Sequence, residues 1–317
     1  MLVKKSCSLK YNFKRIHPFK KKENIELPFT ITIAGKTKHP LTVSRLGYGT
    51  MRLTGEGIYG EPPNRPEALQ ILKEAVASGV QFFDTADYYG EDVTNRLIAE
   101  ALYPYPKGMV ICTKAGASRS PDKSWVVFNN PENIRQAIEN NLRTLKIDQV
   151  QLVHFRVFPG SKTPFTQSME AMFQLQQEGK ILHVGVSNVT REELQTALQM
   201  GAVVTVENMY SHAQRTTLVS AYGENRGGEE VLDLCEASNI PLIPYFSLVN
   251  ALPKKDDRIA TIAKKYNASA AQINIAWLLH RSPLILPIPG TSSLNHFKEN
   301  AKAATIRLTE EDMQYLL

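Results

Sequence analysis

One complete helix–strand unit of this 317-residue chain reads Pro66-Glu-Ala-Leu69-Gln-Ile-Leu72-Lys-Glu-Ala-Val76-Ala-Ser-Gly79-Val-Gln81-Phe-Phe-Asp84. Proline is suited to the first turn of a helix, and Leu69, Leu72 and Val76 recur at the spacing of one apolar stripe. Gly79 then ends the helix. The run 81–84 lacks polar alternation, which is typical of a parallel strand covered on both faces.

The same unit repeats along the chain from about residue 45. Further strands are predicted at Ser44–Gly49, Met109–Lys114, Val150–His154, His183–Ser187, Val203–Val206, Leu242–Tyr245 and Leu284–Ile288. The helices between them begin with Pro131, Pro164 and the capping-box spacings Thr190–Glu193 and Ser269–Gln272. Eight strands alternating with helices and no linker predict an α/β fold, a single (β/α)8 TIM barrel. A doubly wound sheet is the main alternative.

Two segments precede the barrel. Phe29–Ile33 and Lys38–Val43 flank Ala34-Gly35-Lys36-Thr37, which predicts an N-terminal β-hairpin that plugs the end of the barrel remote from the chemistry. Residues 1–22 contain eight Lys and Arg and no acid, whereas the whole chain carries +6. We therefore expect a basic, disordered extension over 1–25 and a barrel domain over 26–317.

The composition excludes several classes of protein. No apolar run reaches the length of a membrane-spanning helix, so we expect no membrane partner. Cys7, Cys112 and Cys235 form neither a disulfide framework nor a zinc motif, which favours a reducing, cytoplasmic location and no metal. Organelle targeting by the basic extension is the alternative location. Because the excess of basic over acidic residues is confined to that extension, we expect no nucleic-acid partner, although a nucleic-acid arm stays an alternative.

One motif is a false lead. Gly55-Glu-Gly57-Ile-Tyr-Gly60 matches the dinucleotide-binding fingerprint, but that fingerprint must open directly into a helix whose N-terminus holds the pyrophosphate. Glu61-Pro62-Pro63 follows Gly60 and cannot continue such a helix. We interpret the segment as a loop above the barrel.

The chemistry is predicted where the strands end. Asp84, Lys114 and His154 close three successive strands, and Tyr89 lies in the loop after Asp84. Active sites of barrel enzymes lie at the carboxyl ends of the strands, and Asp and Lys are rarely fully buried unless paired. The residues alone also allow a buried salt bridge beside a satisfied histidine. Their convergence on neighbouring strand ends favours an active site.

These motifs resemble the aldo/keto reductase superfamily. The resemblance rests on Phe83-Asp84-Thr85-Ala86-Asp87-Tyr88-Tyr89-Gly90, Thr113-Lys114, His154 and Gly185-Val186-Ser187-Asn188, and it extends from Gly47-Tyr48-Gly49-Thr50-Met51 to Glu299-Asn300. Val93-Thr94-Asn95, Ala101-Leu102-Tyr103-Pro104-Tyr105 and Ile288-Pro289-Gly290-Thr291-Ser292-Ser293 further resemble the bacterial pyridoxal reductase branch.

The resemblance implies hydride transfer from a nicotinamide to a carbonyl carbon, with Tyr89 as proton donor. Lys114 would lower the pKa of Tyr89, Asp84 would keep Lys114 charged, and His154 would bind the substrate oxygen. Tyr88 is the rival donor, which the family spacing makes a wall of the pocket. Tyr48 and Arg156 are the other substrate candidates, although a surface or structural salt bridge is the favoured interpretation of Arg156.

The cofactor implied by the resemblance is NADPH, with NADH as the alternative. Ser187 and Asn188 would meet the carboxamide, Tyr245 would stack on the ring, and Leu248 and Asn250 would follow the pyrophosphate. The remaining residues assigned to the cofactor are Gly49, Thr50, Met51, Asp84, Glu207, Phe246, Gly290, Thr291, Ser292, Ser293, His296, Glu299 and Asn300.

The chain departs from the family pattern at the cofactor. Glu207 stands where many relatives have a glutamine, and an ionised carboxylate accepts hydrogen bonds but donates none. The basic residues that bind the 2′-phosphate in the family fall on Gly290 and His296. NADPH would therefore rely on backbone amides, hydroxyls and His296.

We expect a small-molecule carbonyl substrate, with the reduction of pyridoxal to pyridoxine as a candidate reaction. We also expect a monomer or weak homo-oligomer. The chain ends soon after the helix expected to start at Thr309–Asp312, which leaves little length for a substrate loop and predicts relaxed specificity. Two alternatives stay open: a slow-turnover, cofactor-sensing regulatory subunit similar to the channel β subunits of the superfamily, and a barrel aldolase with Lys114 as a Schiff base.

Overall fold

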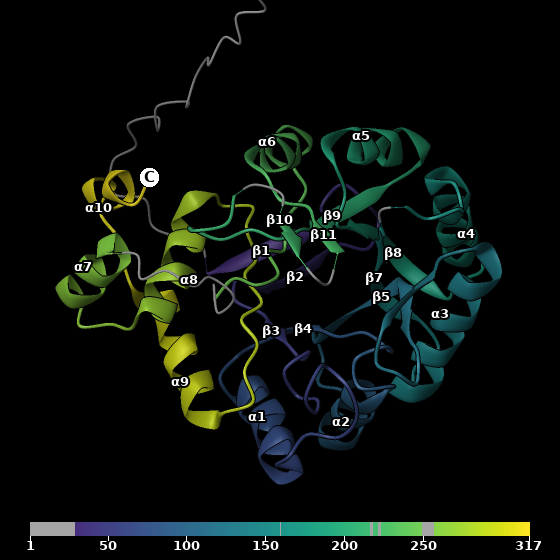
Figure 1. Ribbon diagram of the computed structural model, residues 1–317, viewed down its shortest axis with the longest axis horizontal. Coiled ribbons are helices and arrows are strands. Elements are labelled where there is room, and N and C mark those ends of the chain that lie inside the picture. Colours follow the sequence, from purple (N-terminus) through teal and green to yellow (C-terminus); the bar gives the residue numbers. More distant parts are fainter. Residues whose placement is uncertain (1–28, 159, 216–217, 221–222, 249–256) are drawn as a thin grey trace, which may run out of the picture.

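The computed structural model describes residues 29–158, 160–215, 218–220, 223–248 and 257–317. The predicted basic extension therefore lies outside the described residues. A curled parallel sheet stands at the centre, and Figure 1 shows the helices arranged around it. Among the described residues, no helix is both long and apolar enough to cross a membrane.

Six strands form the parallel sheet, in the order β3-β4-β5-β7-β8-β9. They are β3 (Tyr48–Gly49), β4 (Phe82–Asp84), β5 (Val110–Arg119), β7 (Val150–Arg156), β8 (Ile181–Ser187) and β9 (Val203–Glu207). The segments predicted as the last two strands complete the circle through isolated contacts: Leu242 bridges Val206 and Ile285. The Gly47 amide then donates to the Pro287 carbonyl at 2.9 Å. The barrel prediction is confirmed, but these two positions are bridges and not ladders.

The helices follow the start signals in the sequence. Asn64 and Asn130 cap α1 (Arg65–Ala77) and α3 (Pro131–Leu145), and both predicted capping boxes are present. The other helices are α2 (Val93–Leu102), α4 (Phe165–Gln177), α5 (Arg191–Met200), α6 (Glu229–Ser238), α7 (Asp257–Lys265), α8 (Ala270–Arg281), α9 (Leu294–Lys302) and α10 (Glu310–Tyr315), with the 3-10 helix η1 (Ala303–Thr305). In the described residues that follow Gly60, no helix begins before Arg65, as expected for a loop at the false fingerprint.

The predicted hairpin is present as β1 (Thr30–Ile33) and β2 (Leu41–Ser44), paired antiparallel. Ile31, Ile33 and Val43 are buried against the layer of barrel side chains nearest the starts of the strands. That layer contains Phe82, Val110, Leu152, Val204, Ile243 and Leu286. The hairpin therefore closes the amino end of the barrel and leaves the other end for chemistry.

The structure contains two further antiparallel strand pairs that were not predicted from the sequence. β6 (Trp125–Phe128) pairs antiparallel with the last residues of β5, so that strand continues well beyond Lys114. β10 (Leu218–Ser220) and β11 (Gly223–Asn225) form a second antiparallel pair after β9.

A buried polar network joins α2 and α3 to the strands. The Thr113 hydroxyl donates to Asn141 Oδ1 at 2.6 Å, and Asn95 Nδ2 donates to the same oxygen at 2.8 Å. The Thr85 hydroxyl donates to Asn95 Oδ1 at 2.9 Å. Thr85 and Thr113 directly follow and precede two of the predicted catalytic residues. Hydrogen bonds therefore hold the strand ends against the helical layer.

Candidate active site

Three charged side chains meet inside the barrel at the carboxyl ends of β4, β5 and β9. Lys114 Nζ lies 2.5 Å from Asp84 Oδ1, 3.2 Å from the Thr85 carbonyl and 3.3 Å from Glu207 Oε2. The relative exposure of each of the three residues is 3% or less. The predicted Asp84–Lys114 pair is present, and Glu207 joins it as a second carboxylate on the same ammonium.

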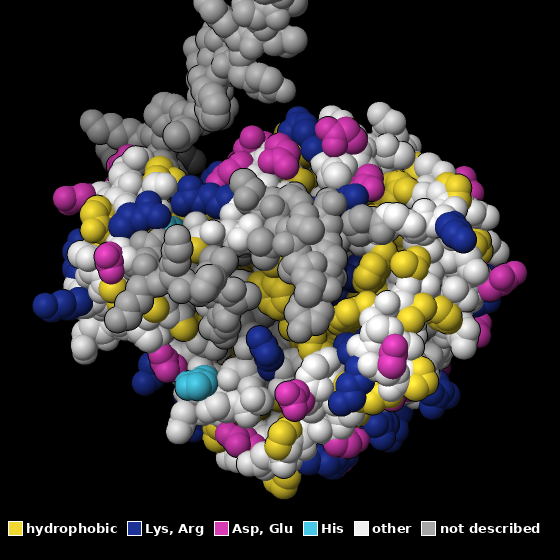
Figure 2. Space-filling view, viewed as in Figure 1, with side chains coloured by type: hydrophobic (Ala, Val, Ile, Leu, Met, Phe, Trp, Pro, Cys, Tyr) yellow, Lys and Arg dark blue, Asp and Glu magenta, His cyan; other side chains and the backbone are white. Residues whose placement is uncertain are grey.

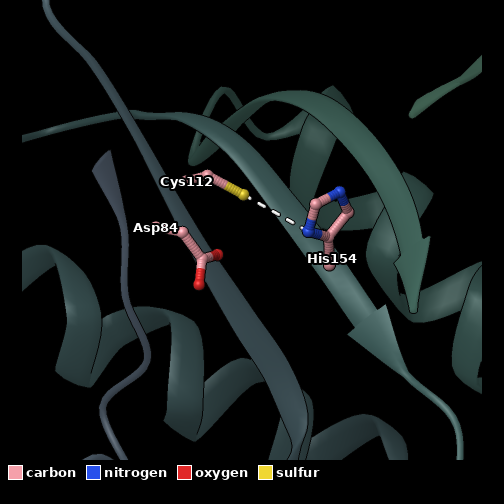
Figure 3. A group of neighbouring side chains, drawn as sticks. All are labelled: Asp84, Cys112 and His154. Carbon is pink, nitrogen blue, oxygen red and sulfur yellow. Dashed lines mark hydrogen bonds between the residues drawn. The ribbon is translucent and has the colours of Figure 1, made fainter. Parts of the chain in front are cut away.

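His154 lies at the same level, and Figure 3 shows its ring beside Cys112 and Asp84. Its Nδ1 is 2.8 Å from Glu207 Oε2 and 3.3 Å from Cys112 Sγ, and its Nε2 is 2.8 Å from the Thr205 hydroxyl. The side chain has no exposed surface. Both ring nitrogens therefore have protein partners, and this conformation offers neither to a substrate oxygen, contrary to the expectation for His154.

The three groups in Figure 3 place a carboxylate oxygen, a thiol and an imidazole nitrogen within 4.8 Å of one another. Such ligands suit a metal ion. Asp84, however, already binds the Lys114 ammonium at 2.5 Å. A cation at this place would have to displace Lys114, so the group is better described as part of the charged cluster.

Tyr89 lies over this cluster, with Lys114 Nζ 5.2 Å from the centre of its ring. Burial raises the pKa of Tyr89 above its ordinary value, and the Lys114 charge lowers it by less. A net lowering of the Tyr89 pKa was expected, and the structure corrects that expectation because desolvation of the buried phenol is the larger effect. Lys114 and Tyr89 nevertheless lie beside each other, as predicted.

The charges of the cluster perturb one another. Burial and the Glu207 charge raise the pKa of Asp84 to about 7, against the opposing effect of Lys114. Burial by itself lowers the pKa of Lys114, but the Asp84 and Glu207 carboxylates raise it well above its ordinary value. Burial lowers the pKa of His154, and Glu207 opposes this. Lys114 is therefore an ammonium ion and His154 a neutral imidazole at neutral pH.

Aromatic side chains pack together above the cluster at the carboxyl end of the barrel, a region that we call the mouth. The Tyr88 ring packs edge-on against Tyr89 and Trp125, and its buried hydroxyl has no hydrogen-bond partner among the described residues. Figure 2 shows hydrophobic side chains gathered on this face over β5 and β7, with Lys and Arg side chains among them. Tyr88 is placed as a wall beside Tyr89, as expected.

Arg156 continues β7 two residues beyond His154 and reaches this mouth. Its guanidinium carbon lies 5.4 Å from the centre of the Phe158 ring and 5.6 Å from that of Tyr245. No carboxylate of the described residues lies within 4.0 Å of it, so the alternative of a structural salt bridge is not what the structure shows. The side chain is a cation set between aromatic rings.

The predicted nicotinamide residues differ in what they leave free. The buried Ser187 hydroxyl has no partner in the described part of the chain. Asn188 donates from Nδ2 to the Val157 carbonyl at 3.0 Å, while its Oδ1 accepts from the Tyr245 hydroxyl at 3.0 Å and from the Arg226 amide at 2.7 Å. Ser187 fits a carboxamide ligand, whereas the Asn188 amide is engaged in holding the strand ends together.

Glu207 was assigned to the carboxamide by position, and the structure places it elsewhere. Its Oε2 lies against Lys114 and His154. Its backbone carbonyl accepts the Asn188 amide at 3.0 Å. Glu207 is thus a member of the charged cluster, which sequence reasoning missed. The available signal was its place at the end of the strand beside Ser187, level with the other strand-end charges.

The residues assigned to the adenosine end lie together between β3 and α9. A Cβ atom at Gly290 would lie 2.6 Å from the Gly49 carbonyl, so these two backbones approach closely. Ser293 caps α9, and its hydroxyl accepts the His296 amide at 3.4 Å. The same Gly290 Cβ would lie 3.8 Å from Arg52 Cγ. The stem of Arg52, a residue that sequence reasoning did not name, therefore lies beside Gly290.

The other assigned residues are placed as follows. The Thr50 hydroxyl donates to the Asp84 carbonyl at 2.9 Å, and Thr291 is buried. Phe246 is exposed beside the Tyr245 ring. Met51 packs at the edge of the cluster of Tyr88 and Tyr89, and Leu248, Ser292, Glu299 and Asn300 lie in the described chain, whereas Asn250 lies outside the described residues.

Tyr48 is not a substrate residue in the structure. Its side chain is fully buried among the helices, against Phe83 and Phe297, and its hydroxyl donates to the Thr291 carbonyl at 2.6 Å. Successive side chains of a strand point to opposite faces, and the flanking Gly47 and Gly49 face the barrel interior. Tyr48 therefore points away from the barrel interior, contrary to the expectation that it contacts the substrate.

Comparison with known proteins places this chain in a family. Residues 45–316 match the model of the aldo/keto reductase family. A pyridoxine 4-dehydrogenase of Escherichia coli (strain K12) is 38% identical over 280 residues, covering 87% of this chain and 94% of that protein. A thermostable aldo-keto reductase solved with the inhibitor epalrestat superposes with a TM-score of 0.75 at 26% identity, covering 90% of this chain and 98% of that one.

A second solved structure carries a nucleotide. It is an aldo/keto reductase from Klebsiella pneumoniae in complex with NADP and acetate, which superposes with a TM-score of 0.69 at 25% identity and covers 87% of this chain and 90% of that one. The family model spans most of this chain, and the curated relative aligns with it over nearly its whole length. This chain belongs to the aldo/keto reductase family.

Proposed function

We propose that the protein reduces an aldehyde or ketone to an alcohol with NADPH, and that Tyr89 delivers the proton to the carbonyl oxygen. The observation that carries the proposal is the buried contact between Lys114 and Asp84 with Tyr89 directly above it. The nicotinamide, when bound, supplies the hydride. The residues of the chain orient the carbonyl, exclude water and deliver the proton.

Tyr89 holds its proton at neutral pH because burial disfavours the phenolate. Reduction creates negative charge on the carbonyl oxygen, and the Lys114 ammonium stabilises both that oxygen and the phenolate left behind. Asp84 keeps the ammonium in place. These residues thus favour proton release only when the substrate develops charge beside them.

NADPH is supported at two places. The partnerless Ser187 hydroxyl is a buried polar atom that a carboxamide would satisfy. At the other end, Arg52 lies beside Gly290, where the basic residues of the family pattern are missing. A single arginine and the capped start of α9 would replace the family's phosphate clamp. Two solved relatives carry NADP and NADPH.

The substrate that fits the mouth is a flat aromatic aldehyde with an anionic group, of which pyridoxal is one. Tyr88, Trp125 and Phe158 provide flat apolar surface, and Arg156 provides a cation with no acidic partner in the described chain. The curated relative is a pyridoxine dehydrogenase, which supports the same class. The Schiff-base alternative is disfavoured, because such a lysine must lose its proton and Lys114 is held as an ammonium by two carboxylates.

The experiment compares Tyr89→Phe with Tyr88→Phe in NADPH oxidation against a panel of aldehydes that includes pyridoxal. Both variants remove one hydroxyl from adjacent buried rings, so they serve as matched controls. We expect Tyr89→Phe to retain less than about a hundredth of wild-type turnover, in line with the loss of a general acid. Its affinity for NADPH, measured by fluorescence, should be unchanged. Tyr88→Phe should keep turnover within about tenfold.

The proposal fails if Tyr89→Phe retains more than a tenth of wild-type turnover. Nucleotide that co-purifies with wild-type protein and is not turned over with any aldehyde would instead support the cofactor-sensing subunit. A clear preference for NADH in the same assay would contradict the role given to Arg52.

A further inference from the structure

Glu207 ends β9 with its carboxylate turned into the reaction centre, where the family pattern has a glutamine amide. We propose that Glu207 is a positioning residue: its carboxylate holds the His154 ring and, as the second anion on Lys114, sets the pH range in which Tyr89 can deliver its proton. The inference rests on the proposed function, because it concerns the same proton.

The first part follows from the geometry around His154. Glu207 Oε2 lies 2.8 Å from Nδ1, and an ionised carboxylate can only accept a hydrogen bond. The negative charge beside Nδ1 therefore favours the tautomer of the neutral imidazole that carries its proton on Nδ1. Nε2 is then an acceptor, and the Thr205 hydroxyl donates to it at 2.8 Å. Glu207 thus fixes both the tautomer and the orientation of the ring.

The second part follows from the balance of charge. The ammonium of Lys114 contacts two carboxylates, one at 2.5 Å and one at 3.3 Å. A typical reductase centre with an amide at this position would have a single carboxylate there. The additional anion cancels part of the positive potential that Lys114 exerts on the phenol of Tyr89, so the phenol keeps its proton to higher pH.

Other ionisable groups face the same space, and all of them belong to the balance. From β4 and the loop after it come Asp84, Tyr88 and Tyr89; from β5 come Cys112 and Lys114; from β7 come His154 and Arg156; and beyond β9 lies Tyr245. Only Lys114 and Arg156 are cations among them. With Asp84 and Glu207 both ionised these charges cancel, so removal of one of the two carboxylates leaves a net charge of +1 around Tyr89.

The test uses two substitutions at Glu207. Glu207→Gln keeps the shape and removes the charge, and its amide oxygen can still accept from His154 Nδ1. The pH dependence of kcat/KM for carbonyl reduction is measured for wild type and for Glu207→Gln. We expect the basic limb of the profile to move to lower pH by about one unit in Glu207→Gln. Oxidation of the alcohol should rise at neutral pH, because Tyr89 then ionises more readily.

Glu207→Asp is the matched control, since it keeps the charge and shortens the reach. Its basic limb should stay within about 0.3 pH unit of wild type, while kcat falls because the contact with His154 is lost. A second readout needs no turnover. Ultraviolet titration of the cofactor-free protein, with Tyr89→Phe as the blank, should show tyrosinate formation at lower pH in Glu207→Gln.

Two results would overturn the inference. One is a Glu207→Gln profile and tyrosinate titration that coincide with those of wild type. The other is a large gain in NADPH affinity with no displacement of the basic limb, which would mean that residue 207 serves the carboxamide. Failure of the proposed function looks different: wild-type protein would then reduce no carbonyl compound at all, while the titration would still report on Glu207.

Discussion

Replacement of Gly185 by alanine would place a methyl group where His154 and Thr205 now meet. The added Cβ would lie 2.3 Å from His154 Cδ2, 2.5 Å from the Thr205 hydroxyl oxygen and 2.8 Å from His154 Nε2. These distances are far below van der Waals contact. The backbone is not the obstacle, because Gly185 is not among the residues with positive φ. The imidazole or the hydroxyl must therefore move.

The expected cost follows from what moves. Overpacking of a well-filled interior costs about 1–3 kcal/mol. Loss of the buried hydrogen bond between Thr205 and His154 adds about 1 kcal/mol. Restriction of the unfolded chain by alanine returns about 0.4–1 kcal/mol. The free energy of unfolding should thus fall by about 1–3 kcal/mol, and displacement of His154 from Glu207 should lower kcat as well.

Equilibrium unfolding in urea and steady-state carbonyl reduction measure the two effects. Gly35→Ala is the control, because its Cβ would meet only Thr32 Cγ2 at an ordinary 3.5 Å. Its urea midpoint should lie at or slightly above that of wild type, because alanine there restricts the unfolded chain without meeting a clash. In a His154→Asn background the smaller side chain makes room, so Gly185→Ala should there cost less than it does alone. A Gly185→Ala protein with wild-type stability and wild-type kcat would refute the described packing of His154.

The two other predictions concern Asp87 and Arg156. Burial raises the pKa of Asp87 to about 7, against the opposing hydrogen bond from Asn140. The folded protein therefore holds this proton across a range, from about pH 4 to 7, in which the unfolded chain releases it, and stability falls as the pH rises through that range. Asp87→Asn should be more stable than wild type at pH 8 and no more stable at pH 4 in urea unfolding; equal differences at both pH values would contradict this. Arg156→Met should raise KM for 4-carboxybenzaldehyde about tenfold and leave that for its neutral methyl ester nearly unchanged, because one charge-assisted contact is lost; an equal change for both aldehydes would show that Arg156 does not read the anion.

The central residues of the site could be predicted from the sequence because the carboxyl ends of parallel strands lie at one edge of the sheet. Asp84, Lys114 and His154 were predicted to end successive strands, and although β5 and β7 continue beyond Lys114 and His154, a closed parallel sheet still brings the three positions together. The neighbours of each group within the barrel were harder to infer. Glu207 also ends a strand, but the pairing of its carboxylate with Lys114 and His154 depends on side-chain reach across the interior, which no local pattern encodes.

Three other differences have simple physical causes. Tyr48 belongs to a short strand between glycines, where the lack of side chains at Gly47 and Gly49 hides the alternation that would have shown which way Tyr48 points. The continuation of β5 into a hairpin with β6 depends on the pairing of residues 116–119 with 125–128, and the turn signal Ser120-Pro121-Asp122 between these arms was not used in the prediction. The net acidity of Tyr89 depends on desolvation, which is a property of the packed interior and not of the residue.

The amides and hydroxyls between the helices and the strands give the reaction centre a frame on the outside of the barrel. Asn141 on α3 accepts from Thr113, the residue before Lys114, and Asn95 on α2 accepts from Thr85, the residue after Asp84. Since Asn95 also donates to Asn141, the two helices and the two strand ends form one hydrogen-bonded frame. The distance between Asp84 and Lys114 therefore depends on residues that do not contact the substrate. Sequence change on the inner faces of α2 and α3 is a route by which relatives of this protein can retune their chemistry while every catalytic side chain stays the same.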